Sequence, residues 1–473
     1  MKSRKDQVQA YFFVVGRLAA AVTHGKPDVL HAPSKRMSTG TVLGVVLAAV
    51  LMGIFGIVGL FVPSAGSSSW RQEGAIVMNK ETGARYVYLG GQLRPVLNYS
   101  SARLVAGKSG SGAVASVSPA SLAGTPVGQP IGIPGAPDAL PAVTKVDGGS
   151  WTVCAQSAGT GQPVVTLLLG LPAEQPLNEA QALLVSASDG TDYLVWRGKR
   201  LRIPESSVLA ALGYGDARPA RVAPAWLNAI PQGADLEAPA VPGAGQPGPV
   251  IDGQQSRVGQ IFQVRNPTIN SDQLYVVRQG GLAPLSRTAA ALLLAAPATR
   301  QAYPDMTVEP IAAGPSALTG VRVSADSGLA GDLPPVPPQV ITPSPDQLPC
   351  VDNELTPTGQ MTSVAETLPA GDVLAASVPL GAHKAGATAD RAAIPAGGGA
   401  LVRQSSAPGA TPGTAFLVTE VGTKYPLADA DVVSALGYGE GSAVVVPAQL
   451  LALLPTGPVL SMDAARKAQD PKP

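Results

Sequence analysis

The chain has 473 residues and nearly balanced charge, with 33 basic and 32 acidic side chains. This balance excludes a protein that recruits nucleic acid through a net positive field, and the three scattered histidines suggest no metal site. The 54 glycines and 46 prolines make up about a fifth of the chain. That share favours short elements joined by many stiff connections.

The first segment, residues 1–40, is predicted to be cytoplasmic and to contain one amphipathic helix. Within residues 6–22, Val8 and Val15 recur near one helical face. Such a helix either lies on the membrane surface or docks onto a cytoplasmic partner, and the periodicity leaves both interpretations open. The residues that we single out for partner docking are Asp6, Tyr11, Phe12, Arg17 and Leu18.

Residues 41–62 form an uncharged apolar stretch that is predicted to be a single transmembrane helix. At about 1.5 Å per residue, the stretch covers the roughly 30 Å hydrocarbon core of a bilayer. A cleaved signal peptide is the alternative, but its apolar region is usually shorter. Seven Lys and Arg side chains but only two Asp precede the stretch, which predicts a cytoplasmic N-terminus and an extracytoplasmic remainder.

Cys154 and Cys350 are the only cysteines, and both lie in the part predicted to be outside the membrane, where disulfides form. A bond between them would close a long loop, and the chain-entropy model assigns such a loop at most about 5 kcal/mol of stabilisation. Two free thiols are the alternative interpretation.

Four segments share a pattern that predicts a small ββα repeat. A strand that begins near an aromatic residue is followed by a turn, a second short strand and an Ala/Leu-rich helix. The motif ALGYG occurs at 211–215 and at 435–439, where Gly213 and Gly437 are placed to end a helix. A unit this small must pack on a neighbour or on a central body. The expected helix N-caps are Asn98, Ser206, Ser286 and Asp429.

The predicted fold class is α+β, with a single transmembrane helix followed by an elongated extracytoplasmic region. This region consists of four small ββα modules around a β-rich central domain. The four repeats are expected at 75–107, 185–233, 269–296 and 414–460. The central domain is expected in three pieces, at 108–184, 251–268 and 300–383. A linker is expected at 384–413 and a disordered tail at 461–473.

One motif raises the question of catalysis. Residues 102–109 read ARLVAGKS, a relaxed phosphate-loop pattern in which Gly107, Lys108 and Ser109 would hold a phosphate. A working loop follows a strand and leads into a helix. Here the preceding residues read as a helix and the following ones do not begin one, so the pattern predicts a helix end that runs into a linker. We therefore expect no catalytic residue, no cofactor and no metal.

Several motifs, taken in order, resemble the EccB family, the membrane-anchored core component of type VII (ESX) secretion systems. The resemblance extends over essentially the whole chain. The motifs are DQVQAYFFVVGRL (6–18), QLRPVLNYSSARL (92–104), PIGIPGAPDALP (130–141), WTVC (151–154), VGQIFQV (258–264) and the repeated ALGYG.

The resemblance implies an inner-membrane subunit that assembles with EccC, EccD and EccE and with copies of itself, and that contacts membrane lipid but not nucleic acid. It also implies a disulfide between Cys154 and Cys350 in the central domain. Family members have been described as ATPases, which the residues of this chain do not support.

We therefore expect a structural subunit that anchors and organises a secretion channel. The alternatives are a membrane-anchored module that binds cell-wall glycan and an extracytoplasmic ATPase. Sedimentation with purified wall would identify the first alternative, and activity that is abolished by Lys108→Ala would identify the second.

Overall fold

The structure is a computed structural model of the chain, and its elements divide into two compact units. The first unit comprises Met1–Gln72, Asn79–Gly83 and Ser116–Gly124, and the second comprises Glu73–Met78, Ala84–Ala115 and Thr125–Pro473. The residues that the structure describes are 4–25, 34–61, 69–107, 113–146, 148–157, 161–170, 175–304, 306–324, 331–356, 359–381, 387–407 and 409–469.

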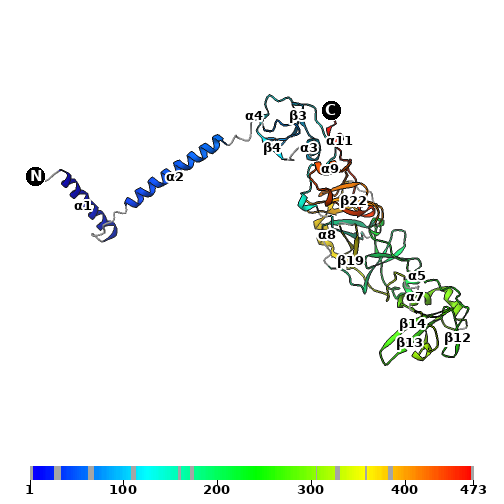
Figure 1. Cartoon of the computed structure of the whole chain (residues 1–473). Helices are drawn as coiled ribbons and strands as arrows, with labels where there is room; N and C mark the ends of the chain where they lie inside the picture. Colours follow the sequence, from blue (N-terminus) through cyan, green and yellow to red (C-terminus); the bar gives the residue numbers. More distant parts are fainter. Residues whose placement is uncertain are drawn as a thin grey trace. The chain divides into compact units, whose positions relative to one another are not determined.

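The first unit contains two long helices, α1 (Arg4–His24) and α2 (Ser34–Phe61) (Figure 1). Helix α1 includes the predicted helix of residues 6–22 and is longer at both ends. Helix α2 includes the predicted apolar stretch up to Phe61. Within the part of the chain that the structure describes, no helix combines the length and the apolar character that crossing a membrane requires.

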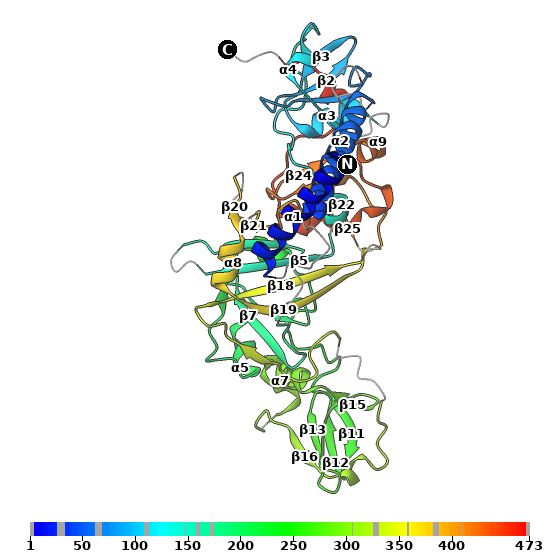
Figure 2. The same ribbon diagram turned by 90° about the vertical axis from the view of Figure 1, so that its left-hand side faces the viewer.

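The second unit is rich in sheets, which agrees with the predicted α+β class. One module occurs four times along the chain: a three-stranded antiparallel meander, a short helix and a strand that returns beside the first strand. Module 4 shows this most simply (Figure 2). Its meander β22 (Gly399–Ser405), β23 (Ala415–Thr419) and β24 (Lys424–Pro426) leads into α9 (Ala430–Ala435), and β25 (Val444–Pro447) pairs parallel with β22.

The other three modules repeat this order. Module 1 consists of β1 (Ile76–Asn79), β2 (Arg85–Leu89), β3 (Gln92–Pro95), α3 (Tyr99–Ala106) and β4 (Val114–Val117). Module 2 consists of β7 (Gln181–Ser186), β8 (Asp192–Trp196), β9 (Lys199–Ile203), α5 (Ser206–Ala211) and β10 (Ala220–Arg221), with β17 (Gln339–Ile341) also paired to β7. Module 3 consists of β13 (Ile261–Asn266), β14 (Ser271–Arg278), β15 (Gly281–Leu285), α7 (Arg287–Ala295) and β16 (Ile311–Ala313).

The predicted hairpin and helix are therefore the middle of a larger module with one more strand at each end. The helix starts follow from capping chemistry. The side chains of Asn98, Ser286 and Asp429 each accept a hydrogen bond from the backbone N–H three residues on, as predicted. Ser206 was expected to cap the helix of module 2 and does not, because that helix begins one residue earlier than expected and Glu205 is its N-cap.

A six-stranded sheet forms the centre of the second unit, with strand order β19-β18-β5-β6-β21-β20 (Figure 2). Its strands come from distant parts of the sequence, so this sheet is discontinuous in the chain. They are β5 (Ser150–Gln156), β6 (Val164–Leu169), β18 (Gln347–Leu355), β19 (Met361–Pro369), β20 (Val378–Pro379) and β21 (Arg391–Ala393), with α8 (Ala370–Ala376) after β19.

Short elements connect the modules and the sheet. They are α4 (Pro119–Leu122), α6 (Pro224–Asn228), β11 (Pro247–Ile251), β12 (Gln254–Arg257), α10 (Ala448–Ala452) and α11 (Met462–Arg466), together with the 3-10 turns at Val143–Lys145, Pro297–Ala302, Pro315–Leu318 and Glu440–Ser442.

Three sequence-based assignments are wrong. The runs at 257–264 and 309–314 were expected in the central domain, but they form β13 and β16 of module 3. The segment 384–413 was expected to be a linker, but it contains β21 and β22. One of its glycines reflects close packing, since a Cβ on Gly399 would collide with the carbonyl oxygen of Val418.

The third error concerns the C-terminus. Residues 461–473 were expected to be a disordered tail, but α11 forms there with Ser461 as its N-cap. Gln469 then donates hydrogen bonds to the backbone carbonyls of Pro130 and Gly132, so the chain is held beyond the helix. Burial of Ala465 against module 1 explains why this polar segment is ordered.

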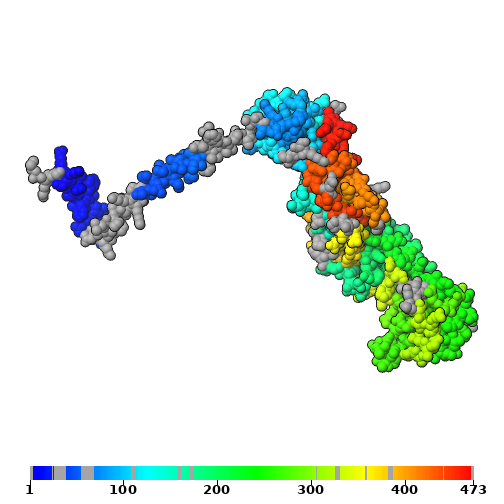
Figure 3. Space-filling model, in the orientation of Figure 1, coloured from blue at the N-terminus to red at the C-terminus, as the bar shows by residue number. Residues whose placement is uncertain are grey.

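Buried apolar clusters give the order of the parts within the second unit. One cluster joins modules 1 and 4 with α11, and these segments lie against each other in Figure 3. A second joins module 4, the central sheet and module 2, and a third joins module 2 to Leu292 of module 3. The modules therefore follow the spatial order 1, 4, centre, 2, 3, which differs from their order in the sequence.

Candidate functional site

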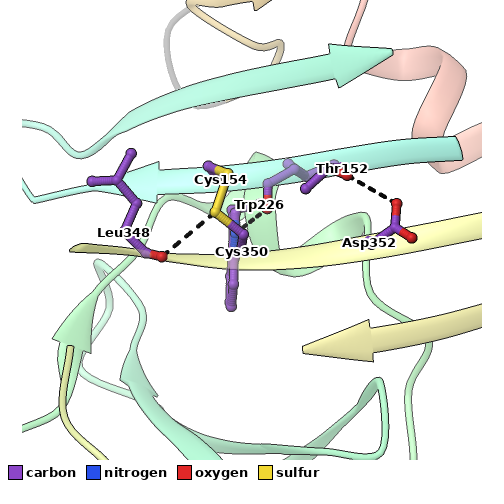
Figure 4. Close-up of a disulfide and its surroundings, with 7 residues drawn as sticks. Thr152, Cys154, Trp226, Leu348, Cys350 and Asp352 are labelled. Atoms are coloured by element: carbon purple, nitrogen blue, oxygen red, sulfur yellow. Dashed lines mark hydrogen bonds between the residues drawn. A yellow bond between two sulfur atoms is a disulfide. The ribbon is translucent and has the colours of Figure 1, made fainter. Parts of the chain in front are cut away.

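The candidate site is the central sheet around its disulfide, because modules 2 and 4 both pack on this sheet. Cys154 in β5 and Cys350 in β18 are direct partners in the antiparallel ladder, with their Cα atoms 4.1 Å apart and their sulfur atoms bonded (Figure 4). Both side chains are fully buried. The predicted disulfide is present, and the alternative of two free thiols is wrong.

Polar side chains join the same two strands on one side of the disulfide. The carboxylate of Asp352 accepts a hydrogen bond from the hydroxyl of Thr152 at 2.9 Å (Figure 4). It also accepts one from the hydroxyl of Ser150 at 2.8 Å. The buried amide of Asn353 donates to the carbonyl oxygen of Trp151 at 3.2 Å. On the other side, the sulfur of Cys350 lies 3.5 Å from the carbonyl oxygen of Leu348. Sheet pairing, side-chain hydrogen bonds and the covalent bond thus hold β5 and β18 in one register.

A tryptophan fixes the segment after module 2 to the strand that carries Cys154. Trp226, in α6, is fully buried, and its indole N–H donates to the carbonyl oxygen of Val153 at 2.9 Å (Figure 4). A buried indole needs such a partner, and this one lies next to the disulfide in sequence. The register of β5 and the position of α6 are therefore coupled.

Two hairpin turns close the edges of the central sheet. The β8–β9 turn of module 2 has Arg197 and Gly198 at φ 47° and 65°, the left-handed conformation of a type I′ turn. A Cβ on Gly198 would fall on the backbone of Ser363 in edge strand β19. In module 4, a Cβ on Gly422 would collide with Leu380, beside the opposite edge strand β20. Each turn thus covers part of an edge strand, and the edge of β19 also pairs with the segment at Pro176 and Leu177.

The tyrosine of each ALGYG motif is a buried hydrogen-bond donor. The hydroxyl of Tyr214 donates to the carbonyl oxygen of Pro338 at 2.7 Å, and that of Tyr438 donates to Pro141 at 2.8 Å. Burial raises the pKa of both phenols well above the usual value of 10, so both stay protonated. The preceding Gly213 and Gly437 have φ 81° and 95°, as a glycine after a helix C-cap requires. The motif therefore holds distant segments together.

The docking residues predicted near the N-terminus all lie on α1 and are exposed. Tyr11, Phe12 and Leu18 have 67%, 68% and 63% of their surface open to solvent. Their spacing places them near one helical face with Val8 and Val15. These side chains form an exposed apolar face on α1.

The family follows from a comparison over the full length. The family model described as "Type VII secretion system ESX-1, transport TM domain B" matches residues 2–473. The chain belongs to the EccB family. The resemblance seen in the sequence motifs is thereby confirmed.

Relatives and solved structures agree with this assignment. This EccB-family chain is 29% identical to "ESX-1 secretion system ATPase EccB1" of Mycobacterium tuberculosis, over 99% of its own length and 95% of the relative. It is 31% identical to "ESX-3 secretion system ATPase EccB3" of the same species, over 98% and 89%. Among solved structures, it resembles a chain of an intact ESX-5 inner membrane complex with TM-score 0.71 and 26% identity, covering 100% of this chain and 96% of that one. It also resembles an EccB3 dimer from the ESX-3 core complex with TM-score 0.67 and 28% identity, covering 83% and 100%.

The word ATPase in the relatives' names directs attention to the phosphate-loop look-alike of this EccB-family chain. Here Gly107 ends helix α3, with φ 64° and its N–H donated to the carbonyl oxygen of Arg103. The motif begins inside helix α3 and strand β4 follows it, the reverse of the strand-loop-helix order that cradles phosphate. Lys108 and Ser109 lie outside the described residues. In the portion that the structure describes, no group of His, Cys, Asp and Glu side chains is arranged to hold a metal ion.

Sequence reasoning missed the residues that join module 1 to the segment at 130–141 and to module 4. Asp138 accepts hydrogen bonds from the guanidinium of Arg85 and from the N–H of Tyr99, the first residue of α3. Burial raises the pKa of Asp138, but these hydrogen bonds outweigh it and lower the pKa below 3.8. Arg103 donates to the carbonyl oxygen of Ala435 at 3.1 Å. The motif PIGIPGAPDALP, which contains Asp138, pointed to this segment as a family feature. The sequence alone does not reveal which residues of module 1 the segment contacts.

Proposed function

We propose that this EccB-family chain is a structural subunit of the type VII (ESX) secretion complex in the inner membrane. One observation carries the proposal: the chain and a subunit of the ESX-5 inner membrane complex match over 100% and 96% of their lengths, with TM-score 0.71. A likeness over the full length supports a shared place in a shared assembly. The modules pack on one another and on the central sheet through buried apolar clusters, which suits that role.

We further propose a single membrane crossing by residues 41–62, with the N-terminus in the cytoplasm and the modules outside. The support is the uncharged composition of this stretch and the excess of Lys and Arg before it. Side chains such as Val42, Leu47 and Met52 of α2 are more than half exposed. A helix whose large apolar side chains are exposed suits a lipid environment.

The exposed apolar face of α1 is proposed to dock onto cytoplasmic parts of partner subunits. Our candidates are EccC, EccD and EccE. Helix-in-groove docking uses side chains spaced three and four residues apart, as Tyr11, Phe12 and Leu18 are placed with Val8 and Val15. We also propose that the chain associates with itself through its extracytoplasmic modules, because one solved relative is an EccB3 dimer. The repeats concerned are those expected at 75–107, 185–233, 269–296 and 414–460.

Co-purification tests the proposal. Tagged full-length chain is extracted from membranes in mild detergent, and the proteins that elute with it are identified by mass spectrometry. The proposal expects an ATPase subunit and a multi-span subunit in the eluate. Recovery of the chain alone, from cells that produce the other subunits, would contradict it.

The docking helix is tested in the same assay with Phe12→Ala combined with Leu18→Ala. Truncating an aromatic and an aliphatic anchor typically reduces affinity by tenfold or more, so the partners should elute in much smaller amounts. Gln9→Ala, which changes an exposed polar position of the same helix, is the matched control and should retain them. Equal recovery with both variants would refute docking through this face.

A further inference from the structure

Helix α8 connects the two edges of the central sheet. Strand β19 is at one edge and β20 is at the other, and in sequence α8 (Ala370–Ala376) leads directly from the first to the second. Figure 2 shows α8 between these two strands. Since β18 and β5 lie between the same edges, the chain crosses the sheet where its two cysteines are paired.

The disulfide lies beneath this crossing. Val373 of α8 is 3% exposed and packs in one buried cluster with Cys154 and Cys350, both of which are fully buried. Leu168 of β6 and Leu348 of β18 complete the cluster on the side of the sheet. Val373 is the one buried residue of α8. A thin helix therefore contributes to the cover that keeps solvent from the two sulfur atoms.

An arginine in the same row of the sheet holds the end of α8. Cys154 is opposite Thr166 of β6, and Thr166 is opposite Arg391 of β21. Residues opposite one another direct their side chains to the same face, so Arg391 extends over the face that carries the disulfide. Its guanidinium donates to the carbonyl oxygen of Leu374 at 3.2 Å, to the hydroxyl of Ser377 at 2.9 Å and to the carbonyl oxygen of Ser377. These carbonyls are at the C-terminal end of α8, where the helix itself offers no donor.

Helix α8 has little stability of its own. It has seven residues, and helices this short are marginal in isolation. Its N-cap is Pro369, which makes no side-chain capping hydrogen bond, and Gly371 is in its first turn. At its start the helix is held to the sheet, because Ala370 donates its N–H to the carbonyl oxygen of Asp346 at 2.7 Å. Its far end depends on the hydrogen bonds from Arg391.

A short helix that is held at its far end by side-chain hydrogen bonds can open locally while the sheet beneath it stays folded. We propose that α8 is a strap over the disulfide and that Arg391 is its latch. Opening of the strap, not unfolding of the sheet, admits thiols to the bond between Cys154 and Cys350. This device is independent of the secretion assembly proposed above.

The reaction that the strap controls is thiol–disulfide exchange with an external dithiol. A thiolate of the dithiol attacks one cysteine sulfur, the S–S bond breaks, and the other cysteine leaves as a thiolate that takes up a proton. The second thiolate of the reductant then attacks its own sulfur in the mixed disulfide. The first cysteine leaves and takes up a proton, and the reductant departs as a disulfide. Two electrons pass to the protein, and each attack requires an exposed sulfur.

The test measures how fast the bond is reduced in folded, full-length protein in mild detergent. Dithiothreitol is the reductant, and samples are quenched with acid, denatured and labelled with a maleimide polymer that shifts the band on a gel. Cys154 and Cys350 are the only cysteines, so the shift reports this bond alone. The rate is measured at several urea concentrations below the unfolding midpoint, because global unfolding depends steeply on urea and local opening does not.

Three variants separate the latch from general destabilisation. Arg391→Ala should be reduced at least about tenfold faster, as loss of charged hydrogen bonds implies. Gly371→Ala should be reduced roughly two- to fivefold more slowly, because alanine favours the helix and no atom would lie within 4 Å of the added Cβ. Arg403→Ala, which changes a half-buried arginine in β22 of module 4, is the matched control and should keep the rate of the unmodified chain.

The expected result is this order of rates, with little dependence on urea in the unmodified chain and in every variant. Equal rates for the unmodified chain and Arg391→Ala would overturn the latch. Reduction of the unmodified chain or of Arg391→Ala that rises with urea as steeply as global unfolding would show that the sheet must unfold, and would overturn the strap. A Gly371→Ala variant that is reduced no more slowly than the unmodified chain would also overturn it.

Discussion

Replacing Gly198 by alanine tests whether the turn of module 2 closes the edge of the central sheet. The residue has φ 65°, and a Cβ there would fall on the backbone of Ser363. Alanine in the left-handed region costs roughly 1–2 kcal/mol. Forcing an atom into a packed contact costs roughly 1–3 kcal/mol more. The free energy of unfolding should therefore fall by about 2–5 kcal/mol.

Gly190→Ala separates the two contributions. Gly190 belongs to the β7–β8 turn of the same module, has φ 85°, and no atom would lie within 4 Å of an added Cβ. The free energy of unfolding of this variant should fall by only the roughly 1–2 kcal/mol that backbone strain costs. Because both substitutions lie in module 2, the same unfolding transition reports on both.

The assay is urea unfolding of the full-length protein in detergent, followed by tryptophan emission. Trp151 and Trp226 are fully buried in the core that module 2 shares with the central sheet, so their emission reports its opening. The reasoning is refuted if the Gly198 and Gly190 variants lose the same free energy within about 0.5 kcal/mol, since the contact with Ser363 would then contribute nothing beyond strain.

Three further outcomes are expected. Cys350→Ala should lower the free energy of unfolding by about 2–5 kcal/mol, measured by urea unfolding, and reducing agent should then have no further effect. Tyr214→Phe should cost about 1–3 kcal/mol, because the buried carbonyl of Pro338 loses its donor, and a loss below about 0.5 kcal/mol would contradict that hydrogen bond. Asp138 has a folded pKa below 3.8, so its contribution to stability is present above that pH and is lost as the pH falls through the folded pKa. Asp138→Asn should flatten the thermal midpoint against pH in this acid range, and a profile identical to that of the unmodified chain would count against the Arg85 and Tyr99 contacts.

Helix caps and turns could be predicted from the sequence because they depend on residues that are neighbours in the chain. Asn98, Ser286 and Asp429 cap helices because a side-chain oxygen reaches an N–H three residues on. The hairpins and the two helix-ending glycines were predictable for the same reason. Membership in the EccB family was recognisable because its motifs keep their order over the whole chain.

Contacts between residues far apart in the sequence could not be predicted. The segment 384–413 resembled a linker because glycine indicates flexibility as often as close approach, and only the position of Val418 distinguishes the two. Strand β13 resembled part of the central domain, since its apolar residues fit either sheet, and only its pairing with β14 and β16 decides. Which carbonyl accepts from Tyr214 likewise depends on a partner 124 residues away.

The bond between Cys154 and Cys350 also makes the middle of the chain a covalent ring. The two cysteines are 196 residues apart, and modules 2 and 3 lie between them. A peptide bond cut anywhere in that interval leaves the N-terminal and C-terminal fragments joined through sulfur. The modules farthest along the spatial order can therefore be nicked by a protease without either fragment leaving, until a reductant reaches a disulfide that is fully buried.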